Sequence, residues 1–156
     1  MNSVTKHAQS RLEDTRTAAD DIVGSGMQTR ETASSAELTG RLSLDPHCQP
    51  IAAQCSGTLI LARLGLLAGV PACTDLTSAP GVQEAGIDVL NQPFYARGNV
   101  ATAGGCLASS YLAAWMIART GGATAAAAAL HCAAPVGEKD SFVANAVKTI
   151  TPYLPR

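Results

Sequence analysis

The pattern of apolar and polar positions predicts short strands that alternate with helices. Segment 21–27 has the pattern of a strand that opens into a glycine turn, and 51–53 that of a short buried strand. Apolar residues recur at helical spacing in 29–44, for which Thr29 is a candidate N-cap, and again in 58–66. Strand, turn, helix, strand and helix in this order are typical of an α/β domain with a parallel sheet.

The middle of the chain predicts a small β-hairpin. Segment 86–90 alternates between apolar and polar residues like a strand, and 94–96 has the same character. The turn at 97–99, Arg-Gly-Asn, then returns the chain into a strand at 100–102. We expect these pieces to complete the sheet.

Three helices are expected after the hairpin. Two glycines precede a helix over 106–119, and a second glycine pair at 121–122 ends it. Alanine-rich residues 123–134 favour another helix by propensity, and 141–154 predict an amphipathic last one. The side of the first helix that should face the core carries Leu107, Tyr111, Leu112, Trp115 and Met116.

Length, charge and composition narrow the classes of function. The 156 residues suffice for one domain, and we divide them into a polar N-terminal segment, 1–19, and a folded domain, 20–156. Eleven Lys and Arg against 12 Asp and Glu, with only 4% aromatic residues, argue against a nucleic-acid partner. No apolar run approaches the roughly 18 residues of a membrane span, so we expect no membrane contact and a cytoplasmic location.

The five cysteines do not suggest a disulfide framework. They stand at 48, 55, 73, 106 and 132, without a C-x-x-C pair, which argues against a disulfide scaffold or a zinc ribbon. His47 and Cys48 are adjacent, but no second pair follows at ligand spacing, so no metal site is predicted. We expect free thiols in a reducing compartment, and no cofactor is indicated.

Cys55 is the strongest candidate for chemistry. It falls where the strand pattern of 51–53 gives way to a helical one, a corner that projects a side chain above the sheet. The N-terminus of the following helix should favour a thiolate, and the small residues Ser56 and Gly57 should let a substrate approach the backbone. The alternative is a buried cysteine that packs as a small hydrophobic residue.

Two other segments bear on the same chemistry. The Gly24-Ser25-Gly26 turn allows a ligand to approach the backbone without a Cβ in the way, and it could donate an N–H group. Cys106 begins a predicted helix after two glycines, which is compatible with an activated thiol or with a packed helix start.

Several short motifs occur together in an order that resembles the DJ-1/PfpI (ThiJ) family. They follow the glycine turn and read A-x-C-S-G at 53–57, G-L-L-A-G at 65–69 and G-N-V-A-T-A-G-G at 98–105. Each motif is weak alone, whereas their joint spacing over residues 20–120 is fairly specific. The resemblance implies a class I glutamine amidotransferase-like domain, which is a flavodoxin-like three-layer α/β sandwich with a mostly parallel sheet.

The resemblance also implies roles for individual residues. Cys55 corresponds to the family's nucleophile-elbow cysteine, the Ser56 N–H to one oxyanion donor and the Gly24-Ser25-Gly26 loop to another. In the family this cysteine serves isocyanide hydration, glyoxalase-type handling of 2-oxoaldehydes, redox sensing and ligand sensing. We expect a hydrolase or lyase that acts on a small electrophilic substrate; the alternatives are a non-enzymatic small-molecule-binding or redox-sensing module and a catalytically degenerate paralogue.

Two departures from the family pattern affect the expected site. Family members have a histidine soon after the G-L-L-x-G motif, where this chain has Asp75. The family's first strand and helix, which carry an acidic residue, have no counterpart in 1–19, so we expect a chain that is shortened at the N-terminus. The sheet edge left uncovered in this way predicts a homodimer.

Asp75 should act on Cys55 in the opposite sense to a histidine. We expect both residues to flank one pocket at the carboxyl ends of neighbouring strands, with Asp75 in a catalytic role. Its negative charge should raise the pKa of the Cys55 thiol. The same residue is equally compatible with a structural cap at the start of a helix.

Overall fold

A four-stranded sheet forms the middle layer of the molecule. The structure is a computed structural model that describes residues 8–155. The sheet has the order β1-β2-β4-β3, in which β1, β2 and β4 are parallel and β3 is antiparallel to β4. The strands are β1 (Asp21–Val23), β2 (Ile51–Gln54), β3 (Phe94–Arg97) and β4 (Val100–Ala103). The predicted hairpin and the predicted, mostly parallel sheet are both confirmed.

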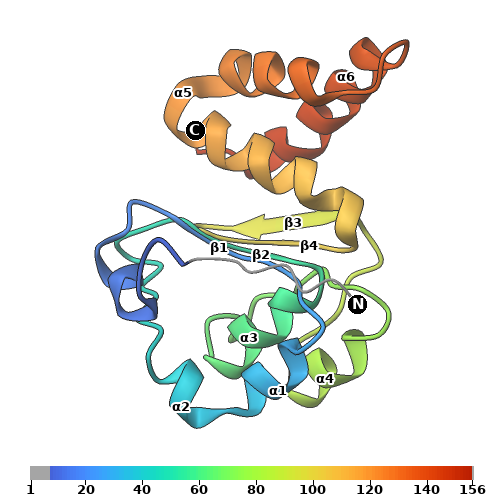
Figure 1. The fold of residues 1–156 in the computed structure, drawn as a ribbon. Helices are drawn as coiled ribbons and strands as arrows, with labels where there is room; N and C mark the ends of the chain where they lie inside the picture. The colour runs from blue at the N-terminus through green and yellow to red at the C-terminus, as the bar shows by residue number, and fades with distance from the viewer. Residues whose placement is uncertain (1–7, 156) are drawn as a thin grey trace, which may run out of the picture.

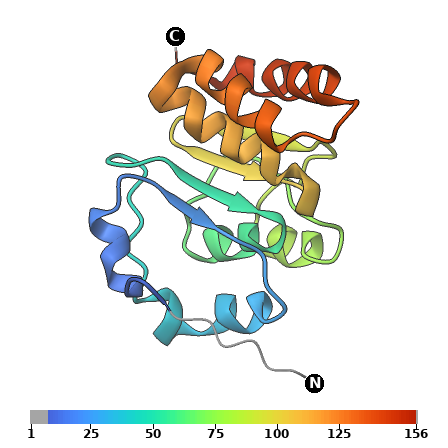
Figure 2. The same ribbon diagram turned by 45° about the horizontal axis from the view of Figure 1, so that its top comes forward.

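Helices cover both faces of this sheet (Figures 1 and 2). One face carries the short helices α1 (Thr29–Ser34), α2 (Ala36–Thr39), α3 (Thr58–Arg63) and α4 (Ala79–Glu84). The other carries the long helix α5 (Ser109–Ala133) and the antiparallel α6 (Lys139–Ile150). The result is a three-layer, flavodoxin-like α/β sandwich, as the sequence predicted.

Four 3-10 turns link these elements. They are η1 (Leu12–Thr17), η2 (Cys55–Gly57), η3 (Cys106–Ala108) and η4 (Thr151–Tyr153). Of the polar N-terminal segment 1–19, residues 1–7 lie outside the described range. Within residues 8–155, no helix combines the length and the apolar character that crossing a membrane requires.

The central strands separate two hydrophobic cores. On β2, Ile51 and Ala53 face the core shared with α3 and α4, whereas Ala52 faces the core under α5 and α6. This is the two-residue alternation of a strand with both faces covered. Trp115 anchors the second core: it is fully buried, and its indole Nε1 donates to the carbonyl oxygen of Tyr153 over 3.2 Å.

The predicted helix over 29–44 is two short helices instead. Ser35 adopts an extended conformation between α1 and α2, and its hydroxyl oxygen accepts the Leu38 N–H over 3.3 Å. Gln28, not Thr29, is the N-cap of α1, and α2 ends at Thr39. Serine side chains compete for backbone hydrogen bonds, so the apolar spacing of this segment overstated its helical length.

The structure also corrects two expectations for the second half of the chain. Leu107 was expected to face the core but is 92% exposed, because residues 106–108 form the turn η3 and do not share the period of α5. Segment 86–90 contributes only an isolated bridge between Val89 and Ala72. The glycine break is confirmed, since Gly122 (φ 80°) interrupts α5.

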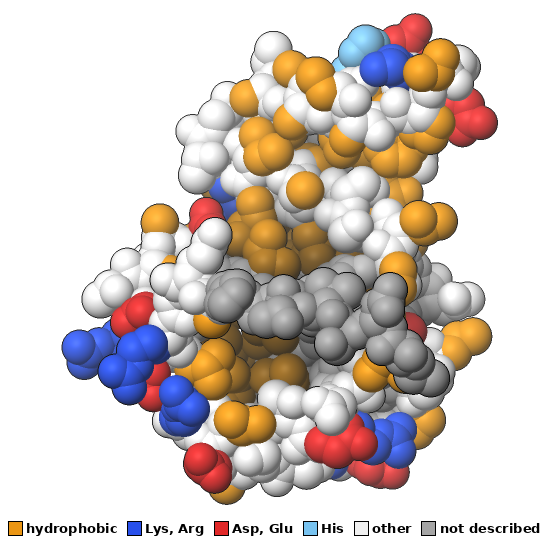
Figure 3. Space-filling view, viewed as in Figure 1, with side chains coloured by type: hydrophobic (Ala, Val, Ile, Leu, Met, Phe, Trp, Pro, Cys, Tyr) orange, Lys and Arg blue, Asp and Glu red, His pale blue; other side chains and the backbone are white. Residues whose placement is uncertain are grey.

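A hollow opens beside the edge strand β1. Between β1 and the two halves of α5 lies a mainly apolar cavity of about 470 Å³, whose wall includes Ile22, Leu112, Ile117, Leu130 and Phe142. Apolar side chains show in the gap between the upper helical layer and the sheet in Figure 3. Ile22 is 54% exposed there.

Candidate functional site

The backbone turns sharply at Cys55, between the end of β2 and the turn η2. Cys55 has φ 55°, and it is the single non-glycine residue with positive φ in the part of the chain that the structure describes. A side chain in this region is strained and persists only where the surrounding structure enforces it. The predicted strand-to-helix corner is therefore present in the backbone.

Gly57 shows what enforces the corner. A Cβ atom on this residue would lie 2.3 Å from the carbonyl oxygen of Val23 and 2.8 Å from that of Gly24. The loop after β1 thus packs directly on the backbone of the corner. Glycine is required here for that packing.

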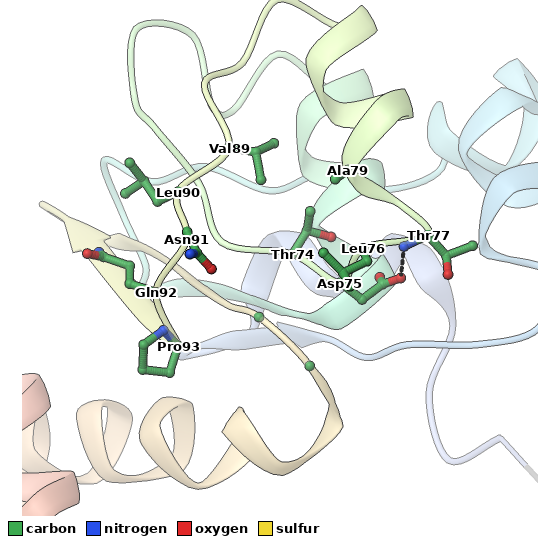
Figure 4. A pocket seen from close by; sticks show the side chains of 12 residues that line it. Thr74, Asp75, Leu76, Thr77, Ala79, Val89, Leu90, Asn91, Gln92 and Pro93 are labelled. Atoms are coloured by element: carbon green, nitrogen blue, oxygen red, sulfur yellow. Dashed lines mark hydrogen bonds between the residues drawn. The ribbon is translucent and has the colours of Figure 1, made fainter.

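Asp75 is held next to the corner by backbone contacts. The hydroxyl of its neighbour Thr74 donates to the carbonyl oxygen of Cys55 over 2.9 Å. Asp75 Oδ1 accepts the N–H groups of Thr77 at 2.9 Å, drawn in Figure 4, and of Ser78 at 3.1 Å. This oxygen therefore caps the turn that leads into α4, whose own N-cap is Ser78, so it has the structural role that the sequence left open.

The second carboxylate oxygen of Asp75 is not used in this way. Asp75 Oδ2 is buried and has no hydrogen-bond partner among residues 8–155. Buried polar atoms without partners are uncommon and call for an explanation, such as a ligand or a catalytic role. One side chain thus offers a capping oxygen and a free acceptor.

Most of the predicted site residues line one cavity of about 680 Å³. Ser25, Gly26, Cys55, Ser56 and Asp75 all contribute to its wall. Gly24 is not among the lining residues; its carbonyl faces the backbone of Gly57 instead. The expectation that Cys55 and Asp75 flank a shared pocket is confirmed. Sequence reasoning missed the remaining wall, which includes Met27, Thr29, Arg30, Leu59, Thr77 and Ser78.

A second cavity, of about 900 Å³, lies on the other side of Asp75 (Figure 4). Its polar wall includes Thr74, Asn91 and Gln92, and its apolar wall includes Leu76, Val89 and Leu90. The glycine pair at 104–105 closes it, because a Cβ on Gly104 would lie 3.0 Å from the Thr74 carbonyl oxygen. That glycine pair, following a strand, was the available sequence signal for this cavity.

The thiol of Cys55 is protonated at neutral pH. Burial, which is the largest effect, and then the Asp75 carboxylate and the Cys106 side chain together raise its pKa to about 11, against the opposing effect of the Ser56 N–H. The expected thiolate is thus wrong, whereas the expected effect of Asp75 is confirmed in direction. The helix α3 begins three residues beyond Cys55, at Thr58, and the helix dipole acts mainly within its first turn.

Asp75 carries the opposite charge state. Burial raises the pKa of its carboxyl group, but the hydrogen bonds from Ser78 and Thr77 and the interaction with Cys55 outweigh burial, and the pKa lies below its usual value. At neutral pH the pocket therefore holds a neutral thiol next to an ionised carboxylate.

The Gly24-Ser25-Gly26 loop forms hydrogen bonds with the hydroxyl groups of Thr29 and Ser56. The Gly26 N–H donates to Thr29 Oγ1 at 3.0 Å and approaches Ser56 Oγ at 3.4 Å. Ser56 Oγ donates to Thr29 Oγ1 over 3.0 Å, and that hydroxyl donates in turn to the Gly26 carbonyl oxygen. A substrate oxygen would have to displace a hydroxyl to reach the Gly26 N–H.

Cys106 also reaches this region. It is exposed, so the packed helix start considered for it is wrong, and it follows Gly105, which has φ 87°. The three side chains of Cys55, Asp75 and Cys106 do not make a metal site: within residues 8–155, no group of three His, Cys, Asp or Glu is arranged to hold an ion.

Comparison with solved structures identifies the fold. *Schizosaccharomyces pombe* DJ-1 superimposes with a TM-score of 0.52 at 14% identity, over 87% of this chain and 66% of that one. A ThiJ/PfpI family protein from *Pseudomonas syringae* gives 0.63 at 19% identity, over 85% and 61%. The chain has the fold of the DJ-1/ThiJ/PfpI family. An *Anabaena variabilis* protein with DJ-1/ThiJ/PfpI-like and ferritin-like domains gives 0.62 at 19%, over 85% and 39%.

The likeness to DJ-1/ThiJ/PfpI proteins is one of fold. No protein-family model matches the sequence, and no curated protein matches it significantly. The chain spans at most about two thirds of the length of the three structures named above, from 39% to 66%. Because one fold serves many activities, function has to be argued from the site.

Proposed function

We propose that the Cys55 thiol adds to the electrophilic carbon of a small substrate, an isocyanide or a 2-oxoaldehyde, and that Asp75 relays the thiol proton. The observation that carries this proposal is the pairing of a neutral Cys55 thiol with an ionised Asp75 carboxylate in the wall of one cavity. Addition of a thiol consumes both sulfur and proton, so a protonated cysteine beside a base suits it.

With an isocyanide, both atoms of the S–H group end on the same carbon. The sulfur of Cys55 forms the S–C bond, and the proton reaches that carbon by way of Asp75, which gives a thioimidate. Water then adds, the C–S bond breaks, and the thiol is recovered with an N-substituted formamide as product. The net reaction is the hydration of the isocyanide.

With a 2-oxoaldehyde, the thiol first adds to the aldehyde carbon and forms a hemithioacetal. Asp75 removes the proton from that carbon and returns it to the neighbouring carbonyl carbon. The hydroxyl proton of the hemithioacetal passes to the former carbonyl oxygen, which leaves a thioester of a 2-hydroxy acid. Water hydrolyses the thioester and frees Cys55. Asp75 Oδ2 is the oxygen for both transfers, because Oδ1 already accepts two backbone N–H groups.

The cavity supports a small, mostly apolar substrate. Its volume of about 680 Å³ lies within the usual range for small-molecule sites. Arg30 contributes to the wall and donates to the Thr77 carbonyl oxygen over 3.4 Å, so the wall also carries a positive charge. The Ser56 N–H, which already lowers the pKa of Cys55, is a candidate donor for charge that develops on the substrate.

The test is turnover of methylglyoxal and of an aryl isocyanide by four proteins: wild type, Cys55→Ser, Asp75→Asn and Cys132→Ser. Cys132 is an exposed cysteine on α5 and serves as the matched control. We expect Cys55→Ser to abolish product formation and Asp75→Asn to slow it by roughly 100-fold or more. Equal turnover by wild type and Cys55→Ser would overturn the proposal.

A non-catalytic sensing module is the second candidate. It is favoured by two observations: the Cys55 thiol is buried and protonated, and the Gly26 N–H is occupied within its own loop. A sensor would form a stoichiometric adduct at Cys55 without releasing product. Mass spectrometry of the intact protein during the turnover assay separates an adduct that accumulates from one that is consumed.

A further inference from the structure

Cys55 and Cys106 lie at the carboxyl ends of neighbouring strands. The parallel register of β2 and β4 pairs Gln54 with Ala103, so each cysteine follows shortly after the end of its strand. The Gln54 side chain joins the two segments: its Nε2 donates to the carbonyl oxygen of Cys106 over 3.0 Å. The residue that precedes Cys55 is thus hydrogen-bonded to the backbone of Cys106.

The side chains of the two cysteines are also close enough to interact. The Cys106 side chain raises the pKa of the Cys55 thiol, and so does the Asp75 carboxylate. Cys106 is exposed, whereas Cys55 is 8% exposed. Cys106 is therefore accessible to a soluble oxidant, whereas Cys55 is largely shielded from solvent.

Cys106 differs in this respect from the other exposed cysteines. Cys48 donates its thiol hydrogen to Asp45 over 3.4 Å, and Cys132 lies on α5, in the layer on the far side of the sheet from α3. Gly105, with φ 87°, precedes Cys106 and gives its backbone freedom to turn.

We propose that Cys55 and Cys106 form a reversible disulfide when a hydroperoxide oxidises Cys106. The inference rests on the placement of two thiols beside a free carboxylate oxygen and does not depend on the proposed function. Its consequence is that oxidation removes the Cys55 thiol from the cavity and leaves it recoverable by a thiol reductant.

The chemistry balances in two steps. The Cys106 sulfur attacks the peroxide, and an S–O bond forms as the O–O bond breaks. Cys106 becomes a sulfenic acid, and an alcohol or water is released. The Cys55 sulfur then attacks the Cys106 sulfur, the S–S bond forms as the S–O bond breaks, and water departs. Asp75 Oδ2 passes the Cys55 proton to the departing hydroxide. Two thiols lose two electrons, and the hydroperoxide gains them.

The test uses the reduced 156-residue chain and a stoichiometric amount of hydrogen peroxide. Remaining thiols are then blocked with a maleimide, and a tryptic digest is examined without reduction. Cleavage at the arginines places Cys55 in peptide 42–63 and Cys106 in peptide 98–119. Because Cys48 shares the first of these peptides, the experiment is repeated in Cys48→Ser.

We expect the free-thiol count to fall from five to three in wild type and from four to two in Cys48→Ser. In both proteins the two peptides should appear as one cross-linked species. Dithiothreitol should restore all thiols. Cys106→Ser should form no such link, and Cys132→Ser should behave as wild type. Persistence of a free Cys55 thiol while Cys106 advances to sulfinic acid overturns the inference, and so does a cross-link that disappears in Cys48→Ser.

Discussion

The side-chain hydroxyl of Thr74 donates a 2.9 Å hydrogen bond to the carbonyl oxygen of Cys55. This contact joins the end of β2 to the segment that begins α4, and it fixes Asp75 beside the corner. Cys55 directly follows β2, whereas Asp75 follows a segment in which Ala72 makes only an isolated bridge to Val89, so the strand expected to end at Asp75 is not among the strands of residues 8–155. Their relative position therefore depends on a few backbone contacts.

Replacement of Thr74 by valine should weaken this connection. The Cys55 carbonyl oxygen would lose its donor, and we expect the free energy of unfolding to fall by about 1–2 kcal/mol. Urea denaturation measures the change. Thr77→Val is the matched control, because Thr77 contributes its backbone N–H to Asp75 and its side chain is exposed. Equal stability of the two variants would contradict the structural role of the Thr74 hydroxyl.

Gly57→Ala should be far more disruptive than Gly24→Ala. The added methyl group on Gly57 would collide with the carbonyl oxygen of Val23 at 2.3 Å, whereas a Cβ on Gly24 meets nothing within 4 Å. We expect a loss of at least about 3 kcal/mol, or failure to fold, for Gly57→Ala, and less than about 1 kcal/mol for Gly24→Ala. Thermal unfolding distinguishes them; similar melting temperatures would show that β1 does not pack on the corner.

Stability should decline in alkaline solution because two thiols are buried. Burial raises the pKa of Cys73 to about 12 and that of Cys55 to about 11, above the ordinary value of 9.0. Between the ordinary and the raised values the native state holds protons that the unfolded chain has released, so the free energy of unfolding falls as pH rises above about 9. Urea denaturation across this range should show a shallower decline for Cys73→Ala than for wild type.

The edge strand β1 predicts self-association. Its outer edge has no neighbouring strand among the described residues, and Ile22 is 54% exposed beside the apolar cavity under α5. We expect sedimentation velocity at micromolar concentration to show a dimer that Ile22→Lys weakens. Val136→Lys, at an apolar residue that is 93% exposed elsewhere, is the control. A wild-type monomer, or equal effects of both substitutions, would contradict an interface at β1.

Periodicity and glycine placement were enough to predict the sheet and the corner. The apolar run before Cys55 and the small residues after it specify a strand that turns, and the structure confirms both. The break in α5 followed equally from its glycine pair. These features depend on neighbouring residues in the chain, so they can be predicted from the sequence.

Features that depend on distant contacts were predicted poorly. The pKa shift of Cys55 was predicted in the wrong direction, because burial and Asp75 outweigh a helix that begins only at Thr58. The split between α1 and α2 depends on the Ser35 side chain. The exposure of Leu107 depends on the 3-10 turn in which it lies. The meeting of Cys55 with Cys106 depends on strand register, which one sequence does not reveal.

The pH dependence of Cys55 alkylation tests the central claim, that Cys55 and Asp75 form one site. Asparagine at position 75 is the sharpest change, because its side-chain oxygen can still accept the Thr77 and Ser78 N–H groups while the negative charge is removed. Asp75→His provides a second variant with a group that can be positively charged. The measurement is the rate of iodoacetamide labelling of Cys55, followed by mass spectrometry from neutral pH to about pH 10.

For wild type we expect the rate to rise with pH throughout this range, because the pKa of Cys55 lies at about 11. In Asp75→Asn and in Asp75→His the rise should begin and level off at lower pH, since the repulsion between carboxylate and thiolate is gone while burial remains. Identical profiles in wild type and both variants would show that Asp75 does not act on Cys55, and would contradict the site described here.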